Sequence, residues 1–300
     1  MILRLYAAAT ALAAPFLTRM LTKRAGRGKE IPARLAERRG IASLERPAGR
    51  LVWVHAASVG ETMSALPLLR LLAARGPVLL TTGTVTSAKL AAERLPPGAL
   101  HQFVPLDVPG WAARFLEHWR PDVAVFLESE IWPNLLTGCD ARGIRRVLVN
   151  GRISAGSARN WARVPRLARR LLGGVSAIHA QSAGDAALFR GLGAANLREW
   201  GNLKFFAAPL PVDDAALARL QAACPGPVWL AASTHPGEEE EIYAAHQALL
   251  AEYPDLITLL VPRHPERGGA VAALCGNAPR RSLGEMPVAG QVYVADTLGE

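Results

Sequence analysis

The stretch LVWVHAASVGETMSALPLL, residues 51–69, decides the fold of this chain. Residues 51–54 are apolar and predict a buried strand, and the small residues 58–60 predict a tight turn after it. A helix is then predicted by apolar residues at helical spacing, namely Leu66, Leu69 and Leu72. A strand, a turn and a helix form half of a βαβ unit, and open sheets built from such units bind ligands at the carboxyl ends of their strands.

Glu61 lies at that end of the strand and allows two interpretations. In the first, Ser58 caps the helix by accepting from the N–H of Glu61, and the Glu61 carboxylate accepts in return from the N–H of Ser58. In the second, Glu61 is a general base, because a helix N-terminus keeps a carboxylate ionised next to the place where a substrate hydroxyl could lie. Both interpretations stay open at this point.

Strand-like and helix-like segments alternate along the following chain. After the opening unit, a strand and a helix that Thr86 or Ser87 could cap are predicted in PVLLTTGTVTSAKLAAERL. They are followed by the strand HQFVPLD, the helix PGWAARFLEHW and the strands DVAVFLESE and RRVLVNGRIS. Repeated strand-helix pairs with apolar strands predict an α/β fold, in which a parallel sheet is covered on both faces.

Further charged residues follow the strands of this predicted sheet. Glu128 and Glu130 are two residues apart at a strand end, so we expect both side chains on one face. Pro133 suits the first turn of the next helix, and Arg152 follows the next strand. Because parallel strands end at one sheet edge, these residues are expected near Glu61, although solvated strand ends would explain them too.

The composition predicts an anionic partner. The chain has 300 residues, half of them hydrophobic, which is enough for two domains, and a net charge of +9. Between Asp140 and Asp185 there are nine arginines and no acidic residue. Four of them have the spacing of one helix face, namely Arg159, Arg163, Arg166 and Arg170. This face is either solvated or binds an anion or a membrane surface, and without interleaved aromatic residues no nucleic-acid partner is expected.

The N-terminal residues predict an attachment to a membrane. Residues 2–21 are rich in Ala and Leu and just long enough to cross a bilayer, and basic residues follow at once. We therefore expect a membrane anchor over residues 1–22, a basic juxtamembrane connection over residues 23–45, and the globular part on the cytoplasmic side of the inner membrane. A cleaved signal peptide and a helix lying in the interface are the alternatives.

A Pro-containing stretch, AAPLPVDD, predicts a boundary between a domain over residues 46–207 and a second α/β domain over residues 208–300. In the second domain Arg263 and His264 follow a strand, where they could bind a phosphate. The chain has neither a dinucleotide fingerprint nor a P-loop. Its three cysteines have no metal-binding spacing, so no zinc site is expected.

Seven motifs stand in one order along this chain: HAASVGE, TTGTVTSA, LESEIWPN, NGRIS, GNLKF, ASTHPGEEE and VPRHPER. Together they resemble the 3-deoxy-D-manno-octulosonic acid (Kdo) transferases of lipopolysaccharide synthesis, from about residue 33 to the end. The resemblance implies a GT-B glycosyltransferase fold of two Rossmann-like domains, with the acceptor on the first and the donor CMP-Kdo on the second. The implied reaction transfers Kdo to lipid IVA at the inner membrane.

The resemblance also implies roles for single residues. Glu61 would accept the proton, and Glu130 and Lys204 would stabilise the transition state. The residues implied in CMP binding are Pro262, Arg263, Gly299 and Glu300. Candidates for binding the acceptor or another anion are Ser58, Gly60, Glu128, Arg152, Arg159, Arg163, Arg166 and Arg170. No metal ligand and no cofactor besides the CMP-Kdo donor is expected.

Two departures from the family pattern qualify these expectations. Gly151 stands where the family usually has Ala. The family's later Gly-rich segment and HNPLE-type motif do not occur before Glu300, so the donor domain is expected to be partial and the chain by itself to transfer little or no Kdo. The competing functions are another GT-B enzyme, of the lipid A disaccharide synthase or nucleotide-sugar epimerase type, and a non-catalytic membrane-attached anion-binding protein.

Overall fold

The computed structural model describes residues 1–128, 131–206 and 212–297. The chain divides into two compact units, Met1–Ala208 and Pro209–Glu300. The sequence places the division at residues 207/208, close to this point.

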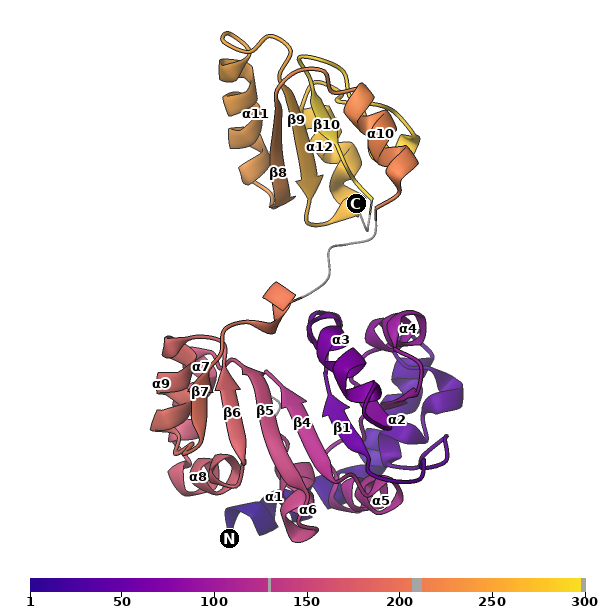
Figure 1. The fold of residues 1–300 in the computed structure, drawn as a ribbon, viewed down its shortest axis with the longest axis vertical. Coiled ribbons are helices and arrows are strands. Elements are labelled where there is room, and N and C mark those ends of the chain that lie inside the picture. Colours follow the sequence, from indigo (N-terminus) through magenta and orange to yellow (C-terminus); the bar gives the residue numbers. More distant parts are fainter. Residues whose placement is uncertain (129–130, 207–211, 298–300) are drawn as a thin grey trace. The chain divides into compact units, whose positions relative to one another are not determined.

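Unit 1 contains a seven-stranded parallel sheet in the order β3-β2-β1-β4-β5-β6-β7 (Figure 1). Its strands are β1 (Val52–His55), β2 (Val78–Thr82), β3 (Ala99–Phe103), β4 (Val123–Leu127), β5 (Arg145–Gly151), β6 (Ala177–Ala180) and β7 (Leu197–Glu199). Its helices are α1 (Ile2–Leu12), α2 (Ala14–Ala25), α3 (Val59–Ala73), α4 (Val85–Arg94), α5 (Pro109–Trp119), α6 (Pro133–Ala141), α7 (Ala155–Ala162), α8 (Pro165–Gly173) and α9 (Ala183–Gly191). Three 3₁₀ turns complete it, η1 (Pro32–Arg34), η2 (Glu37–Arg39) and η3 (Leu203–Phe206). The predicted parallel α/β fold is confirmed.

Each face of the sheet has its own hydrophobic core. On one face, the fully buried Trp53 contacts the ring of Phe115 and belongs to a core that includes side chains from α5, α6, α8 and α9. On the other face, its neighbour Val54 packs with Leu66 and Leu69 of α3 and with Ala91 of α4. Successive residues of a strand point to opposite faces, so continuous apolar runs are what a sheet with two covered faces requires.

The N-cap of helix α4 lies two to three residues earlier than the two predicted caps. Thr84 is the N-cap, and its hydroxyl accepts from the N–H of Ser87. The Ser87 hydroxyl in turn accepts from the N–H of Thr84, which completes a reciprocal capping box. The prediction of Thr86 or Ser87 as the cap was wrong, because Thr86 and Ser87 already lie inside the helix. Pro133 does begin α6, as predicted.

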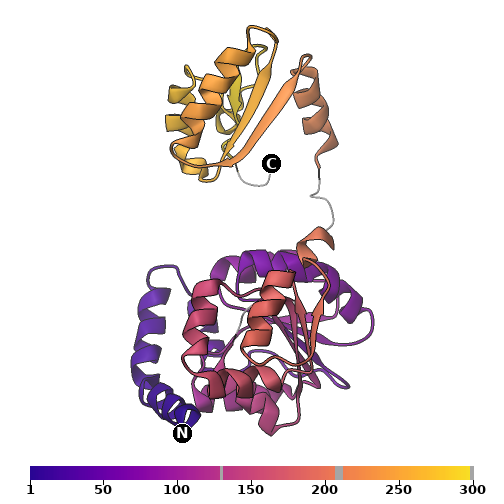
Figure 2. The same ribbon diagram turned by 90° about the vertical axis from the view of Figure 1, so that its left-hand side faces the viewer.

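The N-terminal segment is not a single membrane-spanning helix. It forms α1 and α2, which meet at Ala13 just before Pro15, and no helix in the described part of the chain is long and apolar enough to cross a membrane. Figure 2 shows both helices in indigo along one side of unit 1. The Tyr6 hydroxyl donates to Asp107, and the Asn134 amide donates to Thr10, so α1 is tied to the globular unit. The membrane anchor predicted over residues 1–22 is therefore not found as a membrane-spanning helix in the described part of the chain.

Asp107 joins α1 to the start of α6. Its carboxylate accepts from the Tyr6 hydroxyl and from the backbone N–H groups of Asn134 and Leu135, whose helix has no side-chain cap of its own. Burial raises the pKa of Asp107, and burial and the neighbouring carboxylate raise the pKa of the Tyr6 hydroxyl.

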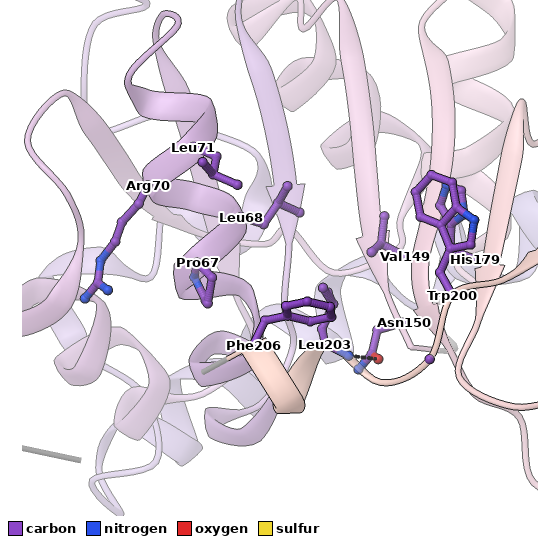
Figure 3. Close-up of a pocket in the computed structure, with 11 residues that line it drawn as sticks. Pro67, Leu68, Arg70, Leu71, Val149, Asn150, His179, Trp200, Leu203 and Phe206 are labelled. Carbon is purple, nitrogen blue, oxygen red and sulfur yellow. Dashed lines mark hydrogen bonds between the residues drawn. The ribbon is translucent and has the colours of Figure 1, made fainter. Parts of the chain in front are cut away.

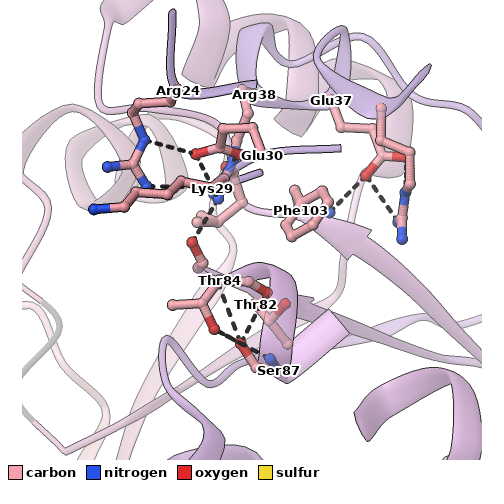
Figure 4. A network of polar contacts seen from close by, with 12 residues as sticks. Arg24, Lys29, Glu30, Glu37, Arg38, Thr82, Thr84, Ser87 and Phe103 are labelled. Carbon is pink, nitrogen blue, oxygen red and sulfur yellow. Dashed lines mark hydrogen bonds and ion pairs between the residues drawn. The ribbon is translucent and has the colours of Figure 1, made fainter. Parts of the chain in front are cut away.

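Residues 23–45 are a folded part of unit 1 and not the predicted juxtamembrane connection. Glu37 is fully buried, and its carboxylate accepts from Arg34, from Ser43 and from the backbone N–H of Phe103 (Figure 4). Arg38 is 3% exposed and pairs with Glu30 at 3.0 Å. The segment looks like a basic connection in the sequence because it contains few acidic residues. In the structure, buried acidic residues of this segment pair with its arginines.

The same network fixes the tautomer of His101. Its Nδ1 lies 3.1 Å from an Arg34 guanidinium nitrogen, which can only donate, so Nδ1 accepts. The proton is then on Nε2, 3.0 Å from the Thr82 hydroxyl. Burial, Arg34 and Arg38 lower the pKa of His101 to about 3, which keeps the ring neutral.

Unit 2 contains a three-stranded parallel sheet in the order β10-β9-β8. The strands are β8 (Val228–Thr234), β9 (Ile257–Pro262) and β10 (Val292–Val294), and the helices are α10 (Asp214–Ala222), α11 (Glu238–Leu249) and α12 (Gly268–Leu274). Two 3₁₀ turns are η4 (Pro265–Arg267) and η5 (Arg281–Leu283). Its core joins β9 and β10 to α12, while Val228 and Leu230 of β8 are exposed. The predicted second α/β series is thus a parallel sheet as well.

Candidate functional site at the carboxyl edge of the larger sheet

Glu61 lies in the first turn of α3, directly after β1. The Ser58 hydroxyl accepts from the Glu61 N–H, as predicted for an N-cap. The return contact differs from the prediction: Glu61 Oε2 accepts from the N–H of Ala57 at 2.8 Å, and Oε1 accepts from the Ser58 hydroxyl at 2.8 Å. The carboxylate therefore reaches one residue farther back than in an ordinary capping box.

The Glu61 carboxylate lies at the start of a helix. The residue is 7% exposed, and its carboxylate oxygens accept from the Ala57 N–H and the Ser58 hydroxyl. The positive end of α3 favours the ionised carboxylate. Next to it, Gly60 is exposed, and a Cβ at this position would meet no atom within 4 Å, so the helix start has open space beside it.

Glu128 lies at the end of β4, the strand beside β1. Its φ of 55° is in the left-handed region, and the strand ends at Leu127. Glu130 itself lies outside the described residues. Arg152, which follows β5, is exposed and donates its backbone N–H to the carbonyl of Glu128 at 3.4 Å.

Lys204 reaches this edge from η3. Its ammonium group lies 3.8 Å from Glu128 Oε1, with about half of the lysine side chain exposed. The turn η3 packs against α3, the helix that Glu61 begins. The structure thus brings Lys204, Glu128 and Arg152 together by direct contacts and places Glu61 at the end of the adjacent strand.

Asn150 is a residue of this site that the sequence did not single out. It precedes Gly151 at the end of β5 with φ of 58°, and its side-chain Oδ1 accepts from the N–H of Leu203 at 2.9 Å. An Asn-Gly pair at a strand end is a local signal for a left-handed residue. The partner 53 positions away could not be read from that signal.

Beside η3 lies an apolar cavity of about 730 Å³, which the sequence also did not reveal (Figure 3). Its lining includes Leu68 and Leu71 of α3, Trp200, and Phe206 of η3. Trp200 is stacked on His179 with 3.9 Å between the ring centroids. Burial and Arg198 lower the pKa of His179, which favours a neutral ring.

The arginine run is divided between two helices. Arg159 lies in α7, Arg163 caps its C-terminus, and Arg166 and Arg170 lie in α8. Pro165 begins α8, so the single helix face that the spacing predicts does not exist. Arg146, another of the nine arginines, is buried and pairs with Asp140 at 2.7 Å.

Arg166 and Arg170 instead line a cavity of about 580 Å³ beside the N-terminal helix. Its other lining residues are Met1, Ile2, Leu3, Arg4 and Leu167. This N-terminal cavity combines cationic and apolar side chains.

The candidate donor residues lie in unit 2. Pro262 ends β9, and Arg263 follows with an exposed side chain while its backbone N–H donates to the Thr234 carbonyl at 3.0 Å. The rings of His235 and His264 are 6.3 Å apart at the same strand ends. Gly299 and Glu300 lie outside the described residues.

The acidic start of α11 has a structural partner. Glu239 is 1% exposed and accepts from two guanidinium nitrogens of Arg267, at 2.7 and 3.2 Å, and from the Thr234 hydroxyl. These hydrogen bonds lower the pKa of Glu239 against the opposing effect of burial. In the described parts of the chain, no three or more His, Cys, Asp or Glu side chains lie together as a metal site would require.

Known proteins similar to this chain include 3-deoxy-D-manno-octulosonic acid transferases. A probable mitochondrial 3-deoxy-D-manno-octulosonic acid transferase of Arabidopsis thaliana is 35% identical over 320 residues, covering 99% of this chain and 70% of that protein. A 3-deoxy-D-manno-octulosonic acid transferase of Rickettsia felis is 36% identical over 259 residues, covering 83% of this chain and 56% of that protein. The chain thus spans between about half and about two thirds of the length of these relatives.

A solved structure shares the fold. It is the UDP-GlcNAc 2-epimerase of Neisseria meningitidis bound to UDP-GlcNAc, with a TM-score of 0.55, 12% identity, and coverage of 84% of this chain and 73% of that one. The family described as 3-deoxy-D-manno-octulosonic-acid transferase matches residues 33–207, more than half of the chain and most of the unit that carries Glu61, Glu128 and Lys204. This protein is therefore a member of the Kdo transferase family.

Proposed function

We propose that this chain acts in the transfer of Kdo from CMP-Kdo to lipid IVA in the synthesis of the lipopolysaccharide core. The observation that carries the proposal is the helix-capping carboxylate of Glu61, with the Glu128–Lys204 pair at the adjacent strand ends, in a chain of the Kdo transferase family. A GT-B arrangement of the two units is part of this proposal.

In the proposed reaction, an acceptor hydroxyl attacks the anomeric carbon of Kdo. The new carbon–oxygen bond forms as the bond from that carbon to the phosphate oxygen of CMP breaks, and CMP leaves with the bonding electrons. Glu61 takes the hydroxyl proton, a role that suits a carboxylate kept ionised at a helix N-terminus. Lys204 and Arg263 offset negative charge on the departing CMP, and Glu130 keeps the transition-state role that the family resemblance implies.

The apolar cavity beside η3 supports a lipid as the acceptor. Its volume of about 730 Å³ is within the range of roughly 300 to 1,000 Å³ that is usual for ligand sites. Arg70 adds a positive charge at its lining, which suits a phosphorylated glycolipid.

The donor assignment is tested by nucleotide binding. We expect the purified chain to bind CMP more tightly than UDP, and Arg263→Met to weaken CMP binding about 5- to 30-fold, because a charged hydrogen bond to phosphate contributes roughly 1 to 2 kcal/mol. Titration calorimetry measures both affinities. Arg219→Met on α10 is a control for the loss of one exposed charge in the same unit. A preference for UDP would favour the epimerase-type alternative over the Kdo transferase.

We further propose that the chain lies on the cytoplasmic surface of the inner membrane by its N-terminal helices. Leu5, Leu12 and Phe16 are more than half exposed there, and the N-terminal cavity holds three arginines. Apolar side chains next to cationic ones are typical of helices that bind in the lipid interface. Anionic lipid headgroups are the partners that this surface requires.

Vesicle binding tests the attachment. We expect the double variant Arg166→Gln/Arg170→Gln to bind phosphatidylglycerol vesicles about 10- to 30-fold more weakly, since each basic residue near an anionic surface contributes roughly 1 kcal/mol. Sedimentation with vesicles at low and high salt measures this difference, which should shrink as salt rises. Arg94→Gln, an exposed residue of α4, controls for net charge. Equal binding by the double variant and the wild type would remove the N-terminal cavity from the attachment surface.

A further inference from the structure

We propose that Asn150 is a positioning residue that holds Lys204 beside Glu128. The proposal rests on the proposed function only in giving Lys204 a part in Kdo transfer. The placement itself follows from the contacts of Asn150.

The backbone of Asn150 is specialised for this contact. The pairing of β5 with β6 shifts its register between Leu148 and Gly151, and Asn150 lies within this irregularity with φ of 58°. Asn is one of the few residues with a side chain that tolerates this region. Such irregularities re-aim side chains, and here the Asn150 side chain is 1% exposed and directed at η3.

The side chain of Asn150 holds the first residue of η3. Oδ1 accepts from the Leu203 N–H at 2.9 Å, which Figure 3 shows as a dashed line. Because a backbone N–H can only donate, this contact also fixes which end of the amide faces η3. Lys204 is the next residue of the chain, so its Cα is fixed by the same bond.

A second connection runs from the backbone of Asn150 to the backbone N–H of Lys204. The Asn150 carbonyl accepts from Gln181 Nε2 at 3.1 Å, and Gln181 Oε1 accepts from Asn202 Nδ2 at 3.4 Å. Asn202 Oδ1 then accepts from the Lys204 N–H at 3.0 Å. Leu203 and Lys204 are thus both tied to Asn150 through their backbone N–H groups.

Packing and charge alone hold η3 weakly. Phe205 is 85% exposed and Phe206 is 65% exposed, so the turn buries little apolar surface. The Lys204–Glu128 pair spans 3.8 Å with a half-exposed lysine, and such pairs contribute little to stability. The buried bond to Asn150 is therefore the contact that determines where Lys204 lies.

Two substitutions separate the parts of this role. Asn150→Gly keeps the left-handed backbone and removes the acceptor, whereas Asn150→Asp keeps an acceptor oxygen and also tolerates the left-handed backbone. We expect amide hydrogen exchange of Leu203 to accelerate about 3- to 10-fold in the Gly variant, since the net contribution of a hydrogen bond is roughly 0.5 to 1.5 kcal/mol. In the Asp variant it should stay within about twofold of the wild type. The control for the fold of the unit is the Phe103 N–H, which donates a hydrogen bond to Glu37.

Kdo transfer gives the second readout. We expect the Gly variant to lower the rate at saturating acceptor about tenfold with an unchanged acceptor KM, as for an interaction made only in the transition state, and the Asp variant to restore it. Unchanged Leu203 exchange in the Gly variant would overturn the proposal. Faster exchange with an unchanged rate would support the positioning by Asn150 and contradict the role of Lys204 in the proposed function.

If the Asn150→Gly variant unfolds, exchange of the Phe103 N–H will accelerate as well. A different variant then tests the positioning of Lys204. Gln181→Ala removes only the second connection, so exchange should accelerate at the Lys204 N–H and not at Phe103. Protection of Lys204 that survives this change would count against the proposed network.

Discussion

Replacing Glu61 by Gln is expected to slow Kdo transfer about 100- to 10,000-fold, the usual contribution of a general base. Gln fits the same capping geometry, since an amide can accept from the Ala57 N–H as the carboxylate does. It cannot take the proton of an attacking hydroxyl. We therefore expect the change to act on the chemical step and to leave the helix start in place.

The rate is best measured in a single turnover, with the protein in excess over labelled CMP-Kdo, because the chain by itself is expected to turn over slowly. Vesicle binding and CMP binding should stay at the wild-type level in the Gln variant. Transfer at the wild-type rate would remove Glu61 as the proton acceptor.

Thr84→Ala provides the matched control for the effect of capping. Thr84 starts α4 after β2 in the way that Ser58 starts α3 after β1, with a reciprocal partner three residues on. Losing this cap is expected to cost about 0.5 to 2 kcal/mol of stability. The rate of transfer should change little, because α4 carries no residue of the proposed site. A similar loss of rate in both variants would mean that disturbed helix starts, and not lost base catalysis, explain the Glu61 result.

Replacing Glu37 by Ala is expected to lower the free energy of unfolding of unit 1 by about 3 to 5 kcal/mol, as when one partner of a buried ion pair is removed. Glu37 is fully buried, and it is the acceptor for Arg34, for the Ser43 hydroxyl and for the Phe103 N–H at the end of β3. Its loss leaves the N–H of the buried Phe103 without this partner and Arg34 without its carboxylate. Gln keeps one acceptor oxygen and should cost less, about 1 to 3 kcal/mol.

Urea unfolding followed by tryptophan fluorescence measures this difference. Six of the seven tryptophans lie in unit 1 and Trp229 lies in unit 2, so the signal reports mainly on unit 1. Glu45→Ala, an exposed neighbour in the same segment, should stay within about 0.5 kcal/mol of the wild type. Wild-type stability of the Glu37 variant would show that residues 23–45 are the loose connection that their composition suggests.

Local sequence patterns succeed here where a residue and its partner are close along the chain. The Ser58 cap and the helix after it follow from neighbours three and four residues apart, and the start of α6 follows from Pro133. The parallel strands follow from continuous apolar runs. The order of seven short motifs was sufficient to indicate the Kdo transferase family, because each motif lies at a strand end where ligands bind.

The same reasoning fails where partners come from distant segments. The four arginines predicted on one helix face have helical spacing in the sequence. In the structure Pro165 starts a new helix and separates them into two groups. The N-terminal segment has the length of a membrane span, but Tyr6 and Thr10 bond to residues more than a hundred positions away. Residues 23–45 look like a basic linker because composition does not show which side chains are buried. In the structure Glu37 and Glu30 are buried and form ion pairs with arginines of this segment.

The sequence by itself therefore determined the strand-turn-helix at residues 51–69, the parallel α/β fold, the family and the candidate proton acceptor. The tertiary structure decided what lies at the neighbouring strand ends: the left-handed Glu128, its pairing with Lys204, and the buried Asn150 that holds η3. The physical reason is that helix caps and strand patterns depend on nearest neighbours along the chain, whereas a site at a sheet edge is assembled from strand ends brought together by the packing of both faces.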